Sequence, residues 1–263
     1  MSDILSLEGK VALVTGAGQG VGRQIALHFA AHGAAGVVVN DYFAERAEAV
    51  AEEIRAAGGR AIAAQADVTD LDAVKAMVAK AKEALGLIDV LVNNAGNAGA
   101  NPSAEVRQPF WETGPEVWNH YIGVNFYGVI NTVTACVPDM IAKESGSIVT
   151  VISDAGRTGE AGLEIYSGAK AGAAGFSRAI ARSLGRYQIR ANCVAIAATL
   201  TPPIEARLRA NPEMFKKMMQ KYVIRRPGRP DDVANMVLFL ASDASSWVTG
   251  QTYPVNGGFS FAQ

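Results

Sequence analysis

Residues 11–22 read VALVTGAGQGVG, a short apolar run that leads directly into a glycine-rich turn. The run covers Val11–Val14, and Gly16, Gly20 and Gly22 follow in the pattern G-x-x-x-G-x-G. A turn without Cβ atoms lets the backbone approach a pyrophosphate, and the helix that follows supplies N–H donors and a positive dipole. An ordinary glycine turn is the alternative interpretation. The strand–turn–helix context favours a site for a nucleotide phosphate.

Outward from this stretch, apolar runs alternate with helical patterns along the whole chain. Seven runs are expected to be strands, at 11–14, 37–39, 61–64, 88–92, 148–152, 189–195 and 252–255. Longer stretches with helical spacing lie at 21–31, 44–57, 71–85, 118–142, 165–186 and 231–241. Runs that are buried on both faces and separated by helices indicate a parallel sheet. The pattern therefore predicts a doubly wound α/β Rossmann fold of about seven strands.

The composition favours one domain. The chain has 263 residues, of which 49% are hydrophobic and 19% charged, enough for one large core. No linker, internal repeat or composition break divides it, so we expect a single domain over residues 1–263. The stretch 196–229 interrupts the alternation between a strand and a helix, and insertions of this kind are typically binding loops. We therefore expect a helical substrate lid over 196–229.

Charge and cysteine content exclude several classes of function. The net charge of −1 is far from the strongly basic footprint of a nucleic-acid-binding domain. Two cysteines cannot form a disulfide framework, and the three histidines have no metal-ligand spacing, so no metal site is expected. No apolar stretch approaches the roughly 18 residues of a transmembrane helix, and the N-terminus lacks the apolar core of a signal peptide. We expect a cytoplasmic protein with no nucleic-acid or membrane partner.

Polar or small residues follow three further runs, at the same edge of the predicted sheet as the glycine turn. Asp41 ends the second run, where a carboxylate can bond both ribose hydroxyls of an adenosine and repel a 2′-phosphate. Asp67-Val68 follows the third run, and Asn93–Gly96 follows the fourth. Turn chemistry explains each alone, but four successive strand ends agree. Because neither Gln19 nor Tyr42 is basic, the pattern predicts NAD rather than NADP.

A second group of reactive residues surrounds the helix after the fifth run. Tyr166 and Lys170 are four residues apart and share one helix face. A free phenol has a pKa of about 10, so a tyrosine that acts as a base needs a neighbouring cation. Ser153 ends the fifth run and can hydrogen-bond the reacting oxygen, and the Asn125 amide can bend its helix or hold a water. A surface pair is the alternative for Tyr166 and Lys170, but their place behind a nucleotide site favours catalysis.

Together these motifs resemble the short-chain dehydrogenase/reductase family, and the resemblance covers nearly the whole chain. The motifs that carry it are Thr15–Gly22, Asp67-Val68, Asn93–Gly96, Asn125, Ser153, Tyr166 with Lys170, Asn192, Thr249–Gln251 and Gly257-Gly258. The resemblance implies that Tyr166 is the general acid/base and that Lys170 lowers its pKa and holds the nicotinamide ribose. It also implies that Ser153 polarises the substrate oxygen, that Asn125 holds a water linking Lys170 to solvent, and that Asp67 and Asn94 flank the adenosine.

One departure from the family lies after the sixth run. Ile196-Ala197 stands where the family has Pro-Gly, while Thr201, with Thr199 beside it, matches the family's threonine that binds the carboxamide. The departure affects the nicotinamide wall and leaves the catalytic set in place. The predicted catalytic residues are Asn125, Ser153, Tyr166 and Lys170. The predicted cofactor contacts are Gly16, Gln19, Gly20, Val21, Gly22, Asp41, Asp67, Val68, Asn94, Ala95, Gly96, Tyr166, Lys170, Thr199 and Thr201.

The substrate is predicted from the lid. Between 205 and 229 the only acidic residues are Glu205 and Glu213. Eight residues of the same stretch are basic: Arg207, Arg209, Lys216, Lys217, Lys221, Arg225, Arg226 and Arg229. Such a patch can hold phosphates, and a solvated helix pair is the alternative. The apolar lid residues suit a bulky ring or acyl group: Leu200, Ile204, Leu208, Met214, Phe215, Met218 and Met219. The stretch 153–166 resembles dehydrogenases of alicyclic hydroxyacyl-CoA esters.

These observations lead to a hypothesis with one runner-up. We expect an NAD-dependent oxidoreductase that interconverts a secondary alcohol and a ketone on an apolar, CoA-linked substrate, with a free alicyclic or steroid alcohol as the alternative. A second hypothesis, from another class of function, is a protein that senses NAD without catalysis, because fold does not determine function. A sensor has no need for Ser153, Tyr166 and Lys170 together, so their joint presence favours catalysis.

The family resemblance also implies a homotetramer. In that assembly the helices near 118–142 and 166–186 pair across a two-fold axis. Small side chains on the second helix would allow close approach, or would pack within the subunit: Ala171, Ala174 and Gly175.

Overall fold

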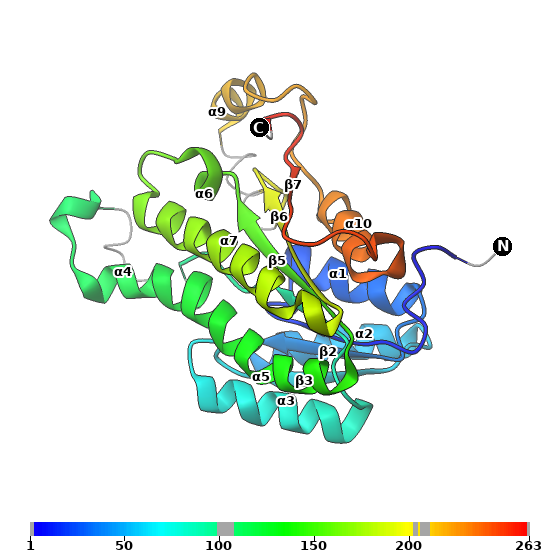
Figure 1. Ribbon diagram of the computed structural model, residues 1–263. Coiled ribbons are helices and arrows are strands. Elements are labelled where there is room, and N and C mark those ends of the chain that lie inside the picture. Colours follow the sequence, from blue (N-terminus) through cyan, green and yellow to red (C-terminus); the bar gives the residue numbers. More distant parts are fainter. Residues whose placement is uncertain (1–2, 99–107, 202–204, 206–210, 262–263) are drawn as a thin grey trace.

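Seven parallel strands form one sheet at the centre of the molecule (Figure 1). The computed structural model describes residues 3–98, 108–201, 205 and 211–261. The strand order is β3-β2-β1-β4-β5-β6-β7, so the chain winds from the middle to one edge, crosses back and winds to the other. The strands are β1 (Val11–Val14), β2 (Gly36–Asp41), β3 (Ala61–Gln65), β4 (Val90–Asn93), β5 (Gly146–Ser153), β6 (Ile189–Ile196) and β7 (Thr252–Val255). The predicted doubly wound α/β fold is confirmed.

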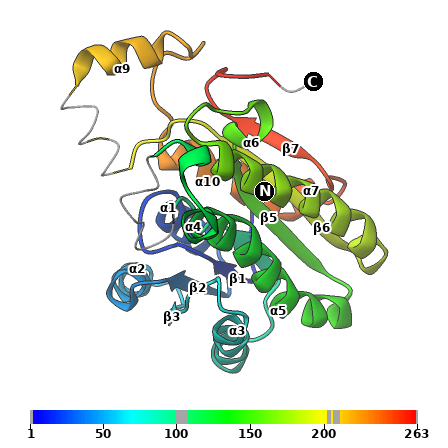
Figure 2. The same cartoon turned by 90° about the vertical axis from the view of Figure 1, so that its left-hand side faces the viewer.

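Helices cover both faces of this sheet (Figures 1 and 2). One face carries α1 (Gly20–Ala31), α2 (Ala44–Ala56) and α10 (Pro230–Ala241), and the other carries α3 (Leu71–Leu85), α5 (Gly128–Lys143) and α7 (Glu164–Leu184). Along β1, Ala12 and Val14 enter the core on one face, and Val11 and Leu13 enter the core on the other. Successive strand side chains point to opposite faces. Both faces are covered, so the strand reads as a continuous apolar run.

The long helix expected over 118–142 is two helices joined by a π turn. α4 begins at Pro115, which suits the first helical turn, and runs to Ile122. The π turn occupies Gly123–Tyr127, and α5 continues from Gly128. Inside the turn, Asn125 Nδ2 donates to the Tyr121 carbonyl oxygen at 2.8 Å. The side chain thus satisfies a backbone acceptor, in agreement with the prediction that Asn125 can bend its helix.

The stretch 196–229 leaves the sheet after β6 and returns beside it. Leu200 N–H donates to the Gly228 oxygen at 2.8 Å, and Gly228 N–H donates to the Ala198 oxygen at 2.9 Å. Between these joined ends lies α9 (Pro212–Met219), outside the two helical layers (Figure 2). Four predicted lid residues and one side chain lie outside the described residues: Ile204, Arg207, Leu208, Arg209 and the side chain of Met214.

The remaining elements are short. α6 covers Ala155–Thr158, and single 3₁₀ turns cover Phe110–Glu112, Gly185–Tyr187 and Asp243–Ser245. No helix in the described part of the chain is long and apolar enough to cross a lipid bilayer. Among the described residues, no three His, Cys, Asp or Glu side chains gather as a metal site requires.

Candidate active site

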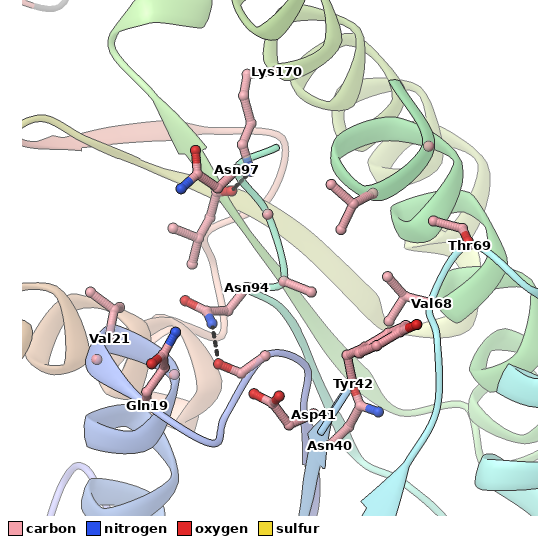
Figure 3. Close-up of a pocket in the computed structure, with 18 of the residues that line it drawn as sticks. Gln19, Val21, Asn40, Asp41, Tyr42, Val68, Thr69, Asn94, Asn97 and Lys170 are labelled. Carbon is pink, nitrogen blue, oxygen red and sulfur yellow. Dashed lines mark hydrogen bonds between the residues drawn. The ribbon is translucent and has the colours of Figure 1, made fainter. Parts of the chain in front are cut away.

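A cleft of about 1090 Å³ lies at the carboxyl ends of the strands from β1 to β6 (Figure 3). In open parallel sheets, ligands bind at this edge. Every predicted site residue except Asn125 lines the cleft. Figure 3 shows Gln19, Asp41 and Asn94 around one end, with Lys170 at the other. The residues predicted from the strand ends therefore lie together in one cleft, and their roles stay predictions.

The glycine turn is packed against the end of β4. Gly16 and Gly20 have φ of +59° and +56°, a region that residues with a Cβ rarely adopt. A Cβ on Gly22 would overlap the Gly16 oxygen and the Asn94 amide. Asn94 Nδ2 donates to the oxygens of Thr15 at 2.9 Å and Gly16 at 3.1 Å (Figure 3). Asn94 therefore holds the turn, and the glycines leave its backbone open to the cleft.

The carboxylate of Asp41 is fixed at the neighbouring wall. It is 6% exposed, and it accepts N–H bonds from Gly18 at 3.1 Å and Phe43 at 3.0 Å. A Cβ on Gly18 would lie 2.7 Å from Asp41 Oδ2 and 2.6 Å from Arg46 Cβ. Gly18 is thus required for this approach, a role that the glycine spacing alone did not reveal. Arg46, which also lines the cleft, was missed because it lies in the first turn of α2 rather than at a strand end.

The loop after β3 forms the facing wall. Asp67 Oδ1 accepts bonds from the Thr69 N–H at 2.9 Å and from the Thr69 hydroxyl at 2.8 Å. Asn131 Nδ2 on α5 donates to the Val68 oxygen at 2.9 Å and fixes the loop. Asp67 therefore stabilises its own turn through these bonds and also lines the cleft.

Lys170 is buried at the inner end of the cleft. Its side chain is 4% exposed, and Nζ donates to the Val151 oxygen at 2.8 Å. Burial lowers the pKa of Lys170 to about 8. Nζ lies 5.9 Å from the centroid of the Tyr166 ring, on the same face of α7. A Cβ on Gly96 would lie 3.1 Å from Nζ, so the absence of a side chain there admits the lysine.

Tyr166 lies beside Ser153, as predicted. Burial raises the pKa of Tyr166, a hydrogen bond to Ser153 lowers it, and Glu160 and Tyr121 raise it further. The ring packs edge-on against Tyr121 at 6.2 Å between centroids. Lowering of the Tyr166 pKa by Lys170 stays a prediction, since burial is the largest influence in this structure.

Asn125 lies behind the cleft rather than in its wall. It is fully buried, Oδ1 accepts the Asn97 N–H at 3.1 Å, and Nδ2 donates to the Asn97 oxygen at 2.6 Å. A Cβ on Gly96 would lie 3.0 Å from Asn125 Oδ1. Asn125 thus clamps the loop that passes next to Lys170. The expected water on Asn125 stays a prediction.

The segment after β6 closes the cleft. Ile196, Ala197, Thr199 and Thr201 line it, so the chain that departs from the family's Pro-Gly still follows this wall. The Ala198 N–H donates to the Tyr222 hydroxyl at 3.1 Å. Residues of α4 also line the cleft, and the sequence patterns gave them no role in the site: Glu116, Asn119 and His120. Their positions depend on the path of α4, which no local motif records.

Comparison with known proteins agrees with this geometry. A family model described as enoyl-(acyl carrier protein) reductase matches residues 16–260. The chain is 38% identical over 261 residues to 7α-hydroxysteroid dehydrogenase of Escherichia coli, covering 98% of this chain and 96% of that protein. It is 40% identical over 258 residues to BbsD, a hydroxy(phenyl)methyl-succinyl-CoA dehydrogenase subunit of Thauera aromatica, covering 97% and 98%.

A solved structure extends the match to three dimensions. It is that of 7α-hydroxysteroid dehydrogenase complexed with NADH and 7-oxo glycochenodeoxycholic acid. The TM-score is 0.90 at 38% identity, over 98% of this chain and 97% of that chain. Sequence and fold therefore agree over nearly the full length of both proteins, and the chain belongs to the short-chain dehydrogenase/reductase family of oxidoreductases.

Proposed function

We propose that this chain is an NAD-dependent dehydrogenase that interconverts a secondary alcohol and a ketone. The observation that carries the proposal is that Ser153, Tyr166 and Lys170 line the same cleft as the glycine turn and Asp41. One end of the cleft thus fits a dinucleotide, and the other holds an acid/base pair.

The residues present fit NAD. A Cβ on Gly22 would overlap the Gly16 oxygen, so the missing side chain lets the turn pack closely against the start of α1, where backbone N–H groups can bind a phosphate. The Asp41 carboxylate, fixed by two N–H groups, can accept hydrogen bonds from both adenosine ribose hydroxyls. The structure of 7α-hydroxysteroid dehydrogenase complexed with NADH has the same fold at 38% identity.

The catalytic residues move one proton. In the oxidation direction, Tyr166 in its phenolate form removes the hydroxyl proton of the alcohol. NAD, when bound, would supply the acceptor for the hydride of the carbinol carbon. Ser153 Oγ accepts the Ala155 N–H at 3.2 Å, so its single hydroxyl hydrogen is left for one acceptor, either the Tyr166 oxygen or the substrate oxygen. The ammonium of Lys170 favours the phenolate by charge, and we propose that it also holds the nicotinamide ribose, as the family resemblance implies.

Two observations support an apolar, CoA-linked substrate. BbsD, which is 40% identical, is named as a dehydrogenase subunit for a CoA ester, hydroxy(phenyl)methyl-succinyl-CoA. The described part of the lid leaves Lys216, Lys217 and Lys221 exposed beside the half-buried Phe215 and Met218, a mixed surface that suits a phosphate-bearing acyl carrier. A free steroid or alicyclic alcohol is the second candidate, supported by the resemblance to 7α-hydroxysteroid dehydrogenase.

A panel of alcohols tests the reaction. Cyclohexanol, 2-hydroxycyclohexanecarboxylic acid, its CoA thioester and a 7α-hydroxysteroid are each offered with NAD and with NADP, and reduced nicotinamide is followed by absorbance. We expect turnover with NAD and at least one of these alcohols. Binding of NADH without turnover of any of them would instead favour the non-catalytic sensor.

Charge reversal in the lid tests the CoA part. Replacing Lys216 and Lys217 by Glu should raise KM for the thioester at low salt and leave KM for the free acid unchanged. The matched control reverses Lys75 and Lys80 on α3, which are exposed like Lys216 and Lys217 but lie outside the lid. If the thioester gains nothing in kcat/KM over the free acid and the lid reversals have no effect, the substrate carries no CoA.

A single domain over 1–263, with 196–229 as its lid, and a cytoplasmic location remain parts of this proposal.

A further inference from the structure

The residue after Ser153 carries a buried carboxylate. Asp154 is 2% exposed; Oδ1 accepts from Arg157 Nη1 at 2.6 Å and Oδ2 accepts from Asn256 Nδ2 at 2.6 Å. The Asp154 N–H donates to the Ile196 oxygen at the end of β6, at 2.9 Å. A carboxylate removed from water is tolerated only when it is paired and hydrogen-bonded. These contacts therefore hold the turn after β5 in one position.

The partners of Asp154 tie the C-terminal segment to this turn. Arg157 Nη1 also donates to Ser260 Oγ at 2.9 Å, and Nη2 donates to the Phe261 oxygen at 3.0 Å. Asn256 Nδ2 donates to the Ser260 oxygen at 2.8 Å, and Asn256 Oδ1 accepts the Gly258 N–H at 3.0 Å. We call the side chains of Asp154, Arg157 and Asn256 the C-terminal clasp. The clasp joins segments about a hundred residues apart, so no local sequence pattern predicts it.

Ser153 lies on the other side of the same turn. Ser153 is the last residue of β5, and Asp154, with φ of −58° and ψ of −28°, begins the turn into α6. Ser153 lines the cleft, whereas none of the three clasp residues does. The Ser153 Oγ accepts the N–H of Ala155, the first residue of α6, so the hydroxyl direction depends on how this turn is held. A displacement of Asp154 would therefore displace Ser153 from Tyr166.

We propose that the C-terminal clasp positions Ser153 for the reaction. Asp154, Arg157 and Asn256 are positioning residues: they fix the turn after β5 so that Ser153 meets both the Tyr166 hydroxyl and the substrate oxygen. The inference rests on the proposed function, because it uses the role given there to Ser153. The other groups that face Tyr166 are Tyr121 on α4, Glu160 before α7 and Lys170 on α7, and the variants below change none of them.

Two variants loosen the clasp without leaving an unpaired buried charge. Asn256→Ala removes one donor to Asp154, and Arg157→Lys keeps the positive charge but cannot make the same set of contacts. Asn192→Ala is the matched control, because Asn192 is also buried and bonds the Val248 oxygen and the Gln251 N–H at the β6–β7 border. Asn192 does not line the cleft.

The first measurement is kcat for alcohol oxidation against pH, with NAD and the panel alcohol that has the highest kcat/KM. A weaker bond from Ser153 disfavours the Tyr166 phenolate, so the rise of kcat should move to higher pH by about one unit in both clasp variants, a loss of about tenfold at pH 7 that recovers in alkali. Asn192→Ala should keep the wild-type midpoint. A uniform loss at every pH, or an equal shift in Asn192→Ala, would overturn the proposal.

The second measurement needs no substrate. Hydrogen–deuterium exchange of the segment 153–158 reports the Ala155 N–H, and it should be faster in both clasp variants and unchanged in Asn192→Ala. Unchanged exchange in the clasp variants contradicts the positioning role even if kcat falls. A wild type that oxidises none of the alcohols contradicts the proposed function instead, so the two failures are distinguishable.

Discussion

At the scale of single residues, we expect Asp41 to have the most direct effect on cofactor choice. We predict that Asp41→Ala relaxes the preference for NAD over NADP, because it removes the ribose acceptor and the repulsion of a 2′-phosphate while Arg46 stays in the cleft. The ratio of kcat/KM for NAD to that for NADP should fall by about tenfold, as for the loss of one hydrogen bond to a charged group.

The control for this change is Asp70→Ala. Asp70 also accepts two backbone N–H bonds, at the start of α3, but it does not line the cleft. Its removal should lower stability without altering the ratio. A wild type with a lower KM for NADP than for NAD would reverse the assignment.

The burial of Lys170 should have a measurable effect on the free energy of unfolding. Its pKa is lowered to about 8 by burial, so folding disfavours the ammonium; this cost is complete below about pH 8 and vanishes above the unfolded pKa of about 10.4. We predict that Lys170→Met abolishes turnover yet raises the free energy of unfolding at pH 7 by about 1–3 kcal/mol. The gain should shrink towards pH 10.

Urea unfolding at pH 7 and pH 10 checks this prediction. Lys80→Met, on the exposed face of α3, is the control and should change little at either pH. A loss of stability at pH 7 in Lys170→Met would mean that the bond from Nζ to the Val151 oxygen outweighs the cost of burying the charge.

Site residues were predictable where the chemistry follows a strand end. Asp41, Asn94 and Ser153 each come directly after or at the end of a buried run, and all three line the cleft. Gly18 and Arg46 were not predictable in this way. Their roles arise from the approach of α2 to the glycine turn, a contact between segments that no single motif contains.

At the scale of secondary-structure elements, a substitution of Asn125 in the π turn gives the main test. Asn125→Ala removes the donor to Tyr121 and both bonds to Asn97 from a fully buried site. We predict a loss of about 2–3 kcal/mol in the free energy of unfolding, because buried backbone groups lose their partners. Turnover should also fall, since the loop held by Asn125 passes next to Lys170.

Asn131→Ala is the matched control for Asn125→Ala. Asn131 lies on α5 and bonds the backbone of Val68 and Thr69, but it is partly exposed. Asn131→Ala should lower the free energy of unfolding, measured by chemical denaturation, by less than Asn125→Ala does. It should leave kcat for alcohol oxidation unchanged. Equal effects of the two changes on kcat would show that Asn125 has no special connection to the catalytic lysine.

Periodicity predicted the elements but not the break within one of them. The helical pattern over 118–142 continues through the π turn, because one extra residue per turn changes the apolar spacing too little to be seen. Asn125 was the available signal, since its side chain can bond backbone groups. The strands were read correctly because both faces of the sheet are covered.

At the scale of the whole molecule, parallel topology brought distant residues together. Because all seven strands run the same way, every strand end predicted from sequence lies on one edge. The course of 196–229 was not predictable to the same degree. Its described parts outside α9 are joined by contacts such as the bond from the Ala198 N–H to the Tyr222 hydroxyl, which depend on the finished fold.

The homotetramer stays a prediction at this scale. Ala171 is exposed and Gly175 half-buried on α7, but Ala174 is 6% exposed and packs in the core of its own subunit. Trp111 and Trp247 are 70% and 99% exposed, an area that assembly would partly cover. Light scattering at micromolar concentration should give four times the mass of the chain. A monomer mass would contradict this expectation.

We propose that the cleft oxidises a secondary alcohol with Tyr166 as the base. The most direct test of this proposal compares wild type and Tyr166→Phe for formation of reduced nicotinamide from NAD and the best panel alcohol, with the Kd for NADH measured on both. We predict that Tyr166→Phe loses turnover and binds NADH nearly as tightly as wild type, because only the proton acceptor is removed. Wild-type kcat in Tyr166→Phe would contradict the account.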